Sequence, residues 1–242
     1  MKKLVKEVDY HEIGNVKFFR SNRAKRSSIK VNHKGEVFVV LPKDEDIEEA
    51  EKFVNGKLEW IRKTKQKVLS KFGEAVVWDR HSKFKTKYCD VKIFPADVKY
   101  VLIHLDENLL EIQYPQDKDV KSEEIQNGIK FGITETLRLE AKDYLPERVK
   151  HLAGKFGLKY NRVYIKHQKT RWGSYSAKGN INLNLELMLL PDELIDFIIL
   201  HELAHSRFPN HGKEFHRLVN KITGGKENEL EAKLSKYWMI LH

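Results

Sequence analysis

Apolar residues alternate with polar ones in several short segments of the first half of the chain, as expected for β-strands. The expected strands are residues 16–20, 28–41, 88–94, 100–105 and 109–114. The second of these contains a turn signal at residues 33–35 and ends before Pro42. Residues 44–71 show helical spacing instead, and Asp44 or Asp46 is the expected cap.

A long helical pattern dominates the second half. It begins at Ser122 and continues to about Phe156, and Pro146 is expected either to kink it or to start a second helix. Two further strands are expected at residues 162–166 and 180–187.

This order of elements indicates an α+β fold. Residues 116–119 are polar and form the best linker candidate. We therefore expect a β-rich N-terminal region with one long helix over residues 1–118, and a second domain over residues 119–242.

A further helical pattern carries the most informative residues of the chain. Pro191 suits its first turn, and Pro209 ends it. One stripe at helical spacing contains Leu194, Ile198, His201, His205 and Phe208. Two histidines in an apolar stripe would be costly to bury without partners, and a metal ion supplies one.

The histidines belong to a His-Glu-x-x-His motif. His201 and His205 lie one turn apart on one face of the helix, so both imidazoles can bind one metal ion. Glu202 lies beside them and can act on a water bound to that metal. With His211 as third ligand, a zinc ion keeps one open position, as in catalytic sites. The competing interpretation is a hydrogen-bonded histidine pair in the core.

Spacing alone leaves three candidates for the third metal ligand. His211 follows the Pro209 break and precedes an amphipathic segment that Asn210 is expected to cap and Gly224 and Gly225 to end. Glu214 and His216 are the alternatives, because both lie in the first turns of that segment.

The motifs together resemble the YgjP-like metallopeptidases, which are related to the SprT and WLM zinc peptidases. The resemblance rests on residues 170–174 (TRWGS), residues 178–184 (KGNINLN), Pro191, residues 201–205 (HELAH) and residues 210–211 (NH). It implies a compact zincin-like domain with His201, His205 and His211 as zinc ligands and Glu202 as the catalytic glutamate. Tyr175 and His216 depart from the residues that the family commonly has, Cys and Trp.

Substrate contacts are expected beside the metal helix. If residues 180–187 form an edge strand, an extended substrate can pair with its backbone, near Asn182 and Asn184. An ordinary half-buried strand is the equal alternative. Arg171 and Trp172 are candidates for substrate or oxyanion contacts, although such a pair is more often structural.

Composition adds bounds on location and partners. The single cysteine, Cys89, permits no internal disulfide, and no apolar run has the length of a signal peptide or a membrane span. We therefore expect a cytoplasmic protein without a membrane partner. The net charge of +10 indicates attraction to polyanions. However, aromatic residues are not interleaved in the basic segments 20–30 and 57–71, so only weak, non-specific nucleic-acid binding is expected.

The sequence thus predicts a metallopeptidase with one zinc ion per chain and protein or peptide substrates. The zinc ion would acidify a water, and Glu202 would take its proton and pass it to the leaving amine. One alternative is a SprT-like protease that acts on DNA-bound proteins. The other is a metal-stabilised nucleic-acid-binding module without turnover, in which Glu202 would have no use.

Overall fold

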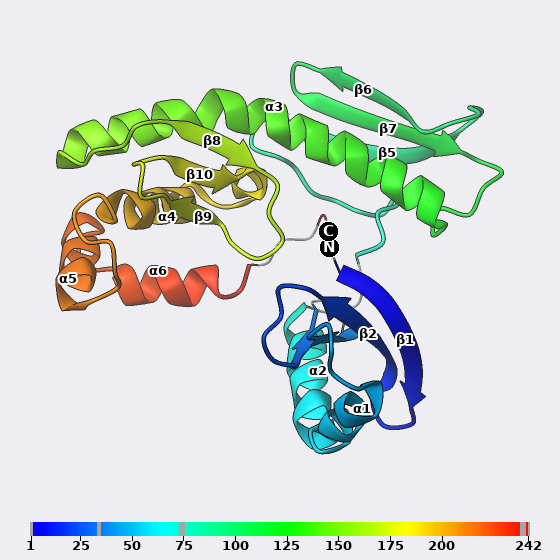
Figure 1. Cartoon of the computed structure of the whole chain (residues 1–242). Helices are drawn as coiled ribbons and strands as arrows, with labels where there is room; N and C mark the ends of the chain where they lie inside the picture. The colour runs from blue at the N-terminus through cyan, green and yellow to red at the C-terminus, as the bar shows by residue number, and fades with distance from the viewer. Residues whose placement is uncertain (1, 33–34, 73–75, 238–240, 242) are drawn as a thin grey trace. The chain divides into compact units, whose positions relative to one another are not determined.

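The computed structural model in Figure 1 describes residues 2–32, 35–72, 76–237 and 241. The first two positions of the turn expected at 33–35 therefore lie outside the described residues. The chain forms two compact units, Met1–Val76 and Val77–His242. Residues 77–118, assigned above to the N-terminal region, pack with the second unit, because Val91 and Ile112 belong to the same apolar core as Ile133 of its long helix.

The N-terminal unit is a four-stranded sheet covered by two helices. Its strands are β1 (Lys2–Tyr10), β2 (Gly14–Ser21), β3 (Ser28–Val31) and β4 (Val37–Leu41), in the order β1-β2-β4-β3. β2 and β4 are parallel, and the other neighbours are antiparallel. The pattern over residues 28–41, expected around a turn at 33–35, corresponds to the antiparallel pair β3 and β4, while β1 was not expected.

The helices of this unit are α1 (Ile47–Asn55) and α2 (Leu58–Phe72). The side chain of Asp46 accepts the backbone N–H of Glu48 at 3.2 Å and caps α1 as expected. The single helix expected over residues 44–71 is interrupted at Gly56, whose backbone N–H still bonds to the carbonyl of Lys52. Ala50, Val54 and Ile61 of the helices share a core with Phe18 of β2 and other buried apolar residues.

The second unit begins with a three-stranded sheet on which a long helix packs. The strands are β5 (Asp90–Ala96), β6 (Leu102–Asp106) and β7 (Leu109–Pro115), in the order β5-β7-β6. Helix α3 (Glu123–Phe156) is continuous, and Pro146 lies inside it rather than starting a second helix. Gly128 and Gly132 let α3 approach the sheet closely. A Cβ at Gly128 would lie 2.7 Å from the side chain of Val101, and one at Gly132 would lie 3.0 Å from that of Ile103.

A smaller sheet carries the segment before the metal-motif helix. Its strands are β8 (Val163–Lys166), β9 (Gly173–Tyr175) and β10 (Ile181–Asn184), in the order β8-β10-β9. The strand expected over residues 180–187 ends at Asn184, whose side chain accepts the backbone N–H of Glu186 and starts the short 3₁₀ helix η1 (Leu185–Leu189). β10 is therefore an inner strand, and the edge next to the metal-motif helix is the unexpected strand β9.

The last helices are α4 (Asp192–Ala204), α5 (Lys213–Ile222) and α6 (Glu227–Leu234). Helix α4 contacts both the small sheet and α3, and Arg148 of α3 donates from Nε to Asp196 of α4 at 2.6 Å. α4 ends before Phe208, which the sequence placed on its stripe, and α6 was not expected. Among the residues described, none of the helices is long and apolar enough to cross a bilayer.

Candidate metal centre

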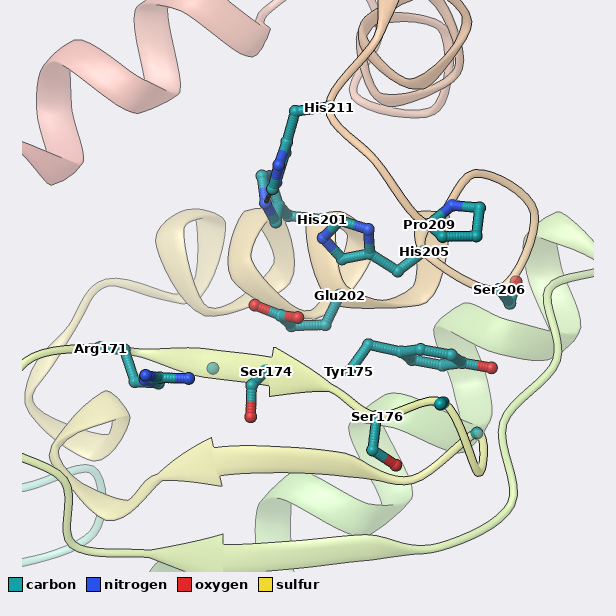
Figure 2. A pocket seen from close by; sticks show the side chains of 13 residues that line it. Arg171, Ser174, Tyr175, Ser176, His201, Glu202, His205, Ser206, Pro209 and His211 are labelled. Carbon is teal, nitrogen blue, oxygen red and sulfur yellow. Dashed lines mark hydrogen bonds between the residues drawn. The ribbon is translucent and has the colours of Figure 1, made fainter. Parts of the chain in front are cut away.

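Three histidines converge at the end of helix α4. His201 and His205 lie one turn apart, and His211 approaches from the loop before α5 (Figure 2). One ring nitrogen from each lies within 4.8 Å of the other two, and Nε2 of His201 is 3.1 Å from Nε2 of His211. In the described part of the chain this is the only such cluster of possible metal ligands.

The backbone orients the second of these rings. Nδ1 of His205 lies 3.1 Å from the carbonyl oxygen of Phe208, in the turn that follows α4. When Nδ1–H donates to that carbonyl, a neutral imidazole presents an unprotonated Nε2 to a metal. The turn after Ala204 therefore places the Phe208 carbonyl where it favours the His205 tautomer with Nε2 free to bind a metal.

An aromatic side chain supports all three rings. Phe215 of α5 is fully buried, and its ring centroid lies 4.9, 4.6 and 4.7 Å from those of His201, His205 and His211. Its position in the first turn of α5 ties that helix to the histidine cluster. Gly212, rather than the expected Asn210, occupies the N-cap of α5.

The two alternative third ligands are engaged elsewhere. Glu214 accepts hydrogen bonds from Arg217 at 2.7 and 2.9 Å on an exposed face of α5. Nδ1 of His216 lies 2.7 Å from the carboxylate of Glu227, which is buried at the start of α6. The geometry therefore brings His211, and neither alternative, into the cluster with His201 and His205.

Glu202 lies on the side of α4 that faces strand β9. Only 8% of its surface is exposed, and this burial raises the pKa of its carboxyl to about 7. A hydrogen bond from the backbone N–H of Tyr175 and the positive charge of Arg171 act in the opposite direction and favour the carboxylate. The result is a carboxyl group that can exchange a proton near neutral pH.

The two histidines of α4, His201 and His205, are held in the neutral form. Burial, together with the nearby imidazoles of His205, His211 and His216, lowers the pKa of His201 to about 4. Burial also lowers the pKa of His205. Only neutral imidazoles bind metal ions, so the cluster is ready for a metal at neutral pH without first releasing protons from these two rings.

A hollow of about 820 Å³ opens beside the histidines and Glu202. Strand β9 and the turn after it form one wall, with Arg171, Gly173 and Tyr175 among the lining residues. The opposite wall comes from the end of α4 and includes Ser206 and Pro209 (Figure 2). The hollow is thus open along an edge strand, which suits an extended ligand.

Of the four expected substrate contacts, only Arg171 lines this hollow. Asn184 is fully buried, and its amide donates to the carbonyls of Gln168 and Arg171 at 2.7 and 3.1 Å. Asn182 donates to the hydroxyl of Ser174 at 3.2 Å, and Trp172 packs against the apolar core. Asn184 is therefore a structural residue that holds the segment leading to Arg171.

Sequence reasoning missed Gly173 as a part of the site. A Cβ at this position would lie 2.8 Å from Cγ and 2.9 Å from Oε1 of Glu202, closer than real side chains approach. Gly173 is therefore required for the close contact between β9 and the glutamate. Gly173 belongs to the Arg-Trp-Gly-Ser segment on which the family resemblance rests, and this was the available signal. Its contact with Glu202 was not predictable, because the two residues lie far apart in the sequence.

One family model and several solved structures are similar to this chain. The family model described as the YgjP-like metallopeptidase domain matches residues 25–237. No curated protein matches the chain. Among solved structures, the zymogen of the metallopeptidase abylysin from Pyrococcus abyssi is 28% identical over 37% of this chain and 90% of that one, with a TM-score of 0.34.

Two other solved structures are similar over comparable lengths. The zymogen of the metallopeptidase jannalysin from Methanocaldococcus jannaschii is 27% identical over 37% of this chain and 91% of that one, with a TM-score of 0.34. A mutant of Wss1 from Saccharomyces cerevisiae is 22% identical over 41% of this chain and 84% of that one, with a TM-score of 0.33.

Proposed function

Since the chain belongs to the YgjP-like metallopeptidase family, and is therefore a metal-dependent hydrolase of proteins, we propose that His201, His205 and His211 hold its metal and that Glu202 is the general base. The observation that carries the proposal is the convergence of three ring nitrogens within 4.8 Å, with Glu202 buried one residue after the first ligand.

We assign the metal as one zinc ion per chain. The donor set consists of three imidazole nitrogens, which suit zinc better than magnesium or calcium, whose preferred ligands are oxygens. Three protein ligands leave a fourth position for a water or substrate. This arrangement on the His-Glu-x-x-His helix is that of a zincin-like peptidase.

When bound, the metal acidifies a water and polarises the scissile carbonyl of the substrate. Glu202 accepts the proton of the attacking water and then gives it to the leaving amine, which needs a carboxyl group whose pKa lies near the working pH. Burial of the Glu202 side chain, which lies in close contact with Gly173, provides that pKa. The N–H of Tyr175 holds one carboxylate oxygen in place.

The substrate is proposed to lie along β9. One side of this strand pairs with β10, while the other borders the hollow beside α4. An extended peptide could pair with the free backbone groups of that side, as in other cases of strand addition. Arg171 lies at one end of this wall and is placed to contact the substrate or its developing oxyanion.

The decisive variant is Glu202→Gln, compared with the wild type and with Glu214→Gln as a control. The amide cannot accept a proton, so we expect Glu202→Gln to retain one zinc per chain while cleaving an unfolded protein at least about 10³-fold more slowly. Glu214→Gln should resemble the wild type, because its carboxylate faces Arg217. Zinc would be measured by elemental analysis and cleavage by gel electrophoresis.

The same experiment, repeated with a protein substrate bound to DNA, addresses both alternatives. Equal cleavage by wild type and Glu202→Gln would contradict the general-base role. A zinc-loaded wild type that cleaves nothing would favour a metal-stabilised binding module. Cleavage that appears only when the protein substrate is bound to DNA would favour a DNA-directed protease.

A further inference from the structure

The strand register of the N-terminal sheet places a defined set of side chains on the face away from its helices. Directly paired residues of neighbouring strands point to the same face. One row across this face is Lys30, Phe38, Lys17 and Glu7, on β3, β4, β2 and β1. The next row is Ser28, Val40, Phe19 and Leu4 on the same four strands.

The opposite face is the one that the helices cover. Its rows contain Val16 and Val37, then Phe18 and Val39, and these four residues are buried in the core with α1 and α2. Within this unit, the described helices therefore leave the outer face without a covering element. Phe19 and Phe38 lie at the centre of that face next to Val40, which is only 6% exposed, while both phenylalanine rings remain partly exposed.

These aromatic side chains form a shallow site. The ring centroids of Phe19 and Phe38 lie 6.0 Å apart, and both rings are partly exposed. Together with Lys30 and Val40 they line a hollow of about 180 Å³. The exposed ammonium group of Lys30 borders an otherwise apolar surface, so the site offers a flat apolar contact and a positive charge at once.

The charge around this site is predominantly positive. Residues 1–76 contain 18 Lys and Arg against 12 Asp and Glu, a net charge of +6. Residues 20–30 contain five cations and no carboxylate, and they form the end of β2, the following loop and β3. Three carboxylates lie near this face: Glu7 and Asp9 on β1, at its edge, and Glu36, 3.8 Å from Lys17. A fourth, Glu45, accepts a hydrogen bond from Ser27 beside the loop.

The cations of this segment differ in their availability. Arg20 donates to the backbone carbonyls of Pro42 and Lys43, so its guanidinium is part of the fold. Arg23, Lys25 and Arg26 are exposed on the loop beside the row that contains Phe19. These three side chains and Lys30 are therefore the cations that a ligand on the outer face would meet.

We propose that this outer face, defined by Phe19, Phe38, Lys30 and the loop cations Arg23, Lys25 and Arg26, binds single-stranded nucleic acid with little sequence preference. Unpaired bases stack on Phe19 and Phe38, and the phosphates lie along the cations. An aromatic pair on an open sheet, flanked by positive charge, fits a ligand with planar bases and a polyanionic backbone. A duplex hides its base faces and would use the charges alone.

This binding needs neither the metal nor Glu202, so it is tested in full-length Glu202→Gln protein, in which turnover cannot alter the sample. The probe is a fluorescein-labelled oligothymidylate, and binding is followed by anisotropy at low salt. We expect Phe19→Leu/Phe38→Leu to bind about 10-fold to 100-fold more weakly, because leucine keeps the apolar volume but cannot stack. Circular dichroism reports whether the variant folds.

Two controls separate stacking from charge. Phe53→Leu removes an exposed phenylalanine of α1, outside the outer face, and should leave binding unchanged. Affinity falls with rising salt, and Arg23→Gln/Lys25→Gln/Arg26→Gln should make this fall less steep. The slope of log affinity against log salt should decrease in magnitude by up to about 2, at roughly 0.7 per lost phosphate contact.

Three results would overturn the proposal. One is equal binding of oligothymidylate by the folded Phe19→Leu/Phe38→Leu variant and its parent. Another is tighter binding of a duplex of the same length. The third is a Phe19→Leu/Phe38→Leu variant that loses binding of a denatured protein but keeps binding of oligothymidylate. This result would make the face a site for unfolded polypeptide.

Discussion

The two units of the chain place their polar groups in opposite ways. In the C-terminal unit, buried polar residues include Glu140, Asn184, Glu186, Glu202 and Glu227, and they lie inside or beside the apolar core. In the N-terminal unit, Ser21 is the only buried polar residue among those described. The residues that we propose to bind nucleic acid lie on the sheet face away from the helices.

This difference indicates how each unit should respond to mutation. A buried carboxyl group acts through a few specific contacts, and the loss of one contact can cost several kcal/mol. Exposed cations on a surface act through their sum, and each contributes little. Single substitutions should therefore have large effects in the C-terminal unit and small, additive ones in the N-terminal unit.

The largest expected effect is at the third ligand. His211→Ala should lose bound zinc and proteolysis together, because two imidazoles alone bind zinc far more weakly than three. The matched control is His216→Ala, since His216 is engaged with Glu227 and should be dispensable for metal binding. Elemental analysis of both purified variants gives the zinc content.

Hydrogen exchange measured segment by segment shows whether the loss of zinc affects the C-terminal unit alone. Zinc loss in His211→Ala should speed exchange in α4 and α5 and leave β2 and β4 unchanged. Full zinc in His211→Ala, with loss in His216→Ala, would reverse the ligand assignment.

A smaller effect is expected from Gly173→Ala. The added methyl group would lie 2.8 Å from Cγ of Glu202, so the glutamate or strand β9 must move. We expect proteolysis to fall by about 10²-fold while zinc content stays unchanged, since displacement of a catalytic group by about 1 Å has that effect.

Gly154→Ala is the matched control, because a Cβ there meets no atom within 4 Å and alanine favours the helix α3. Both variants would be compared in zinc content, melting temperature and rate of proteolysis. Unchanged activity in Gly173→Ala would show that the carboxylate of Glu202 tolerates displacement, and that its contact with β9 is not needed for catalysis.

These residues also show which features the sequence could predict. The helix α4 and the histidine pair follow from local spacing, although Pro191 is the N-cap rather than a first-turn residue and the helix ends at Ala204, before Pro209. The contact of Gly173 with Glu202 joins residues 29 positions apart, and no periodicity reports it. Strand β9 has three residues, too few for an alternating pattern, so its place as the edge strand was missed.

The N-terminal face was missed for a related reason. Phe19 and Phe38 are 19 residues apart and come from neighbouring parallel strands, so only the register places them together. Composition therefore suggested that no aromatic residues accompany the basic segment. The strands on either side of the turn in residues 28–41 were predicted correctly, but the pairing of β4 with β2 as well as with β3 decides which side chains share a face.

The smallest expected effect concerns pH and the metal-free protein. Glu202 has a pKa of about 7 in the folded state against an ordinary value of 4.5, so it contributes stability that is complete below pH 4.5 and lost as the pH rises through 7. His201 has a pKa of about 4 against 6.5, so its contribution is present above pH 6.5 and lost as the pH falls through 4. Each contribution amounts to at most about 3 kcal/mol.

The C-terminal unit of the metal-free protein should therefore be most stable between about pH 5 and 6.5. Glu202→Gln should remove the loss of stability toward pH 8, because the amide carries no titratable proton. Amide exchange in α4, corrected for the intrinsic rate, measures this in chelator-treated protein. The N-terminal unit provides the internal control, since none of its described Asp, Glu or His residues is buried as a whole residue. A fall in protection toward pH 8 that is equal in β2 and α4, or that persists in Glu202→Gln, would mean that the pH dependence does not arise from the buried glutamate.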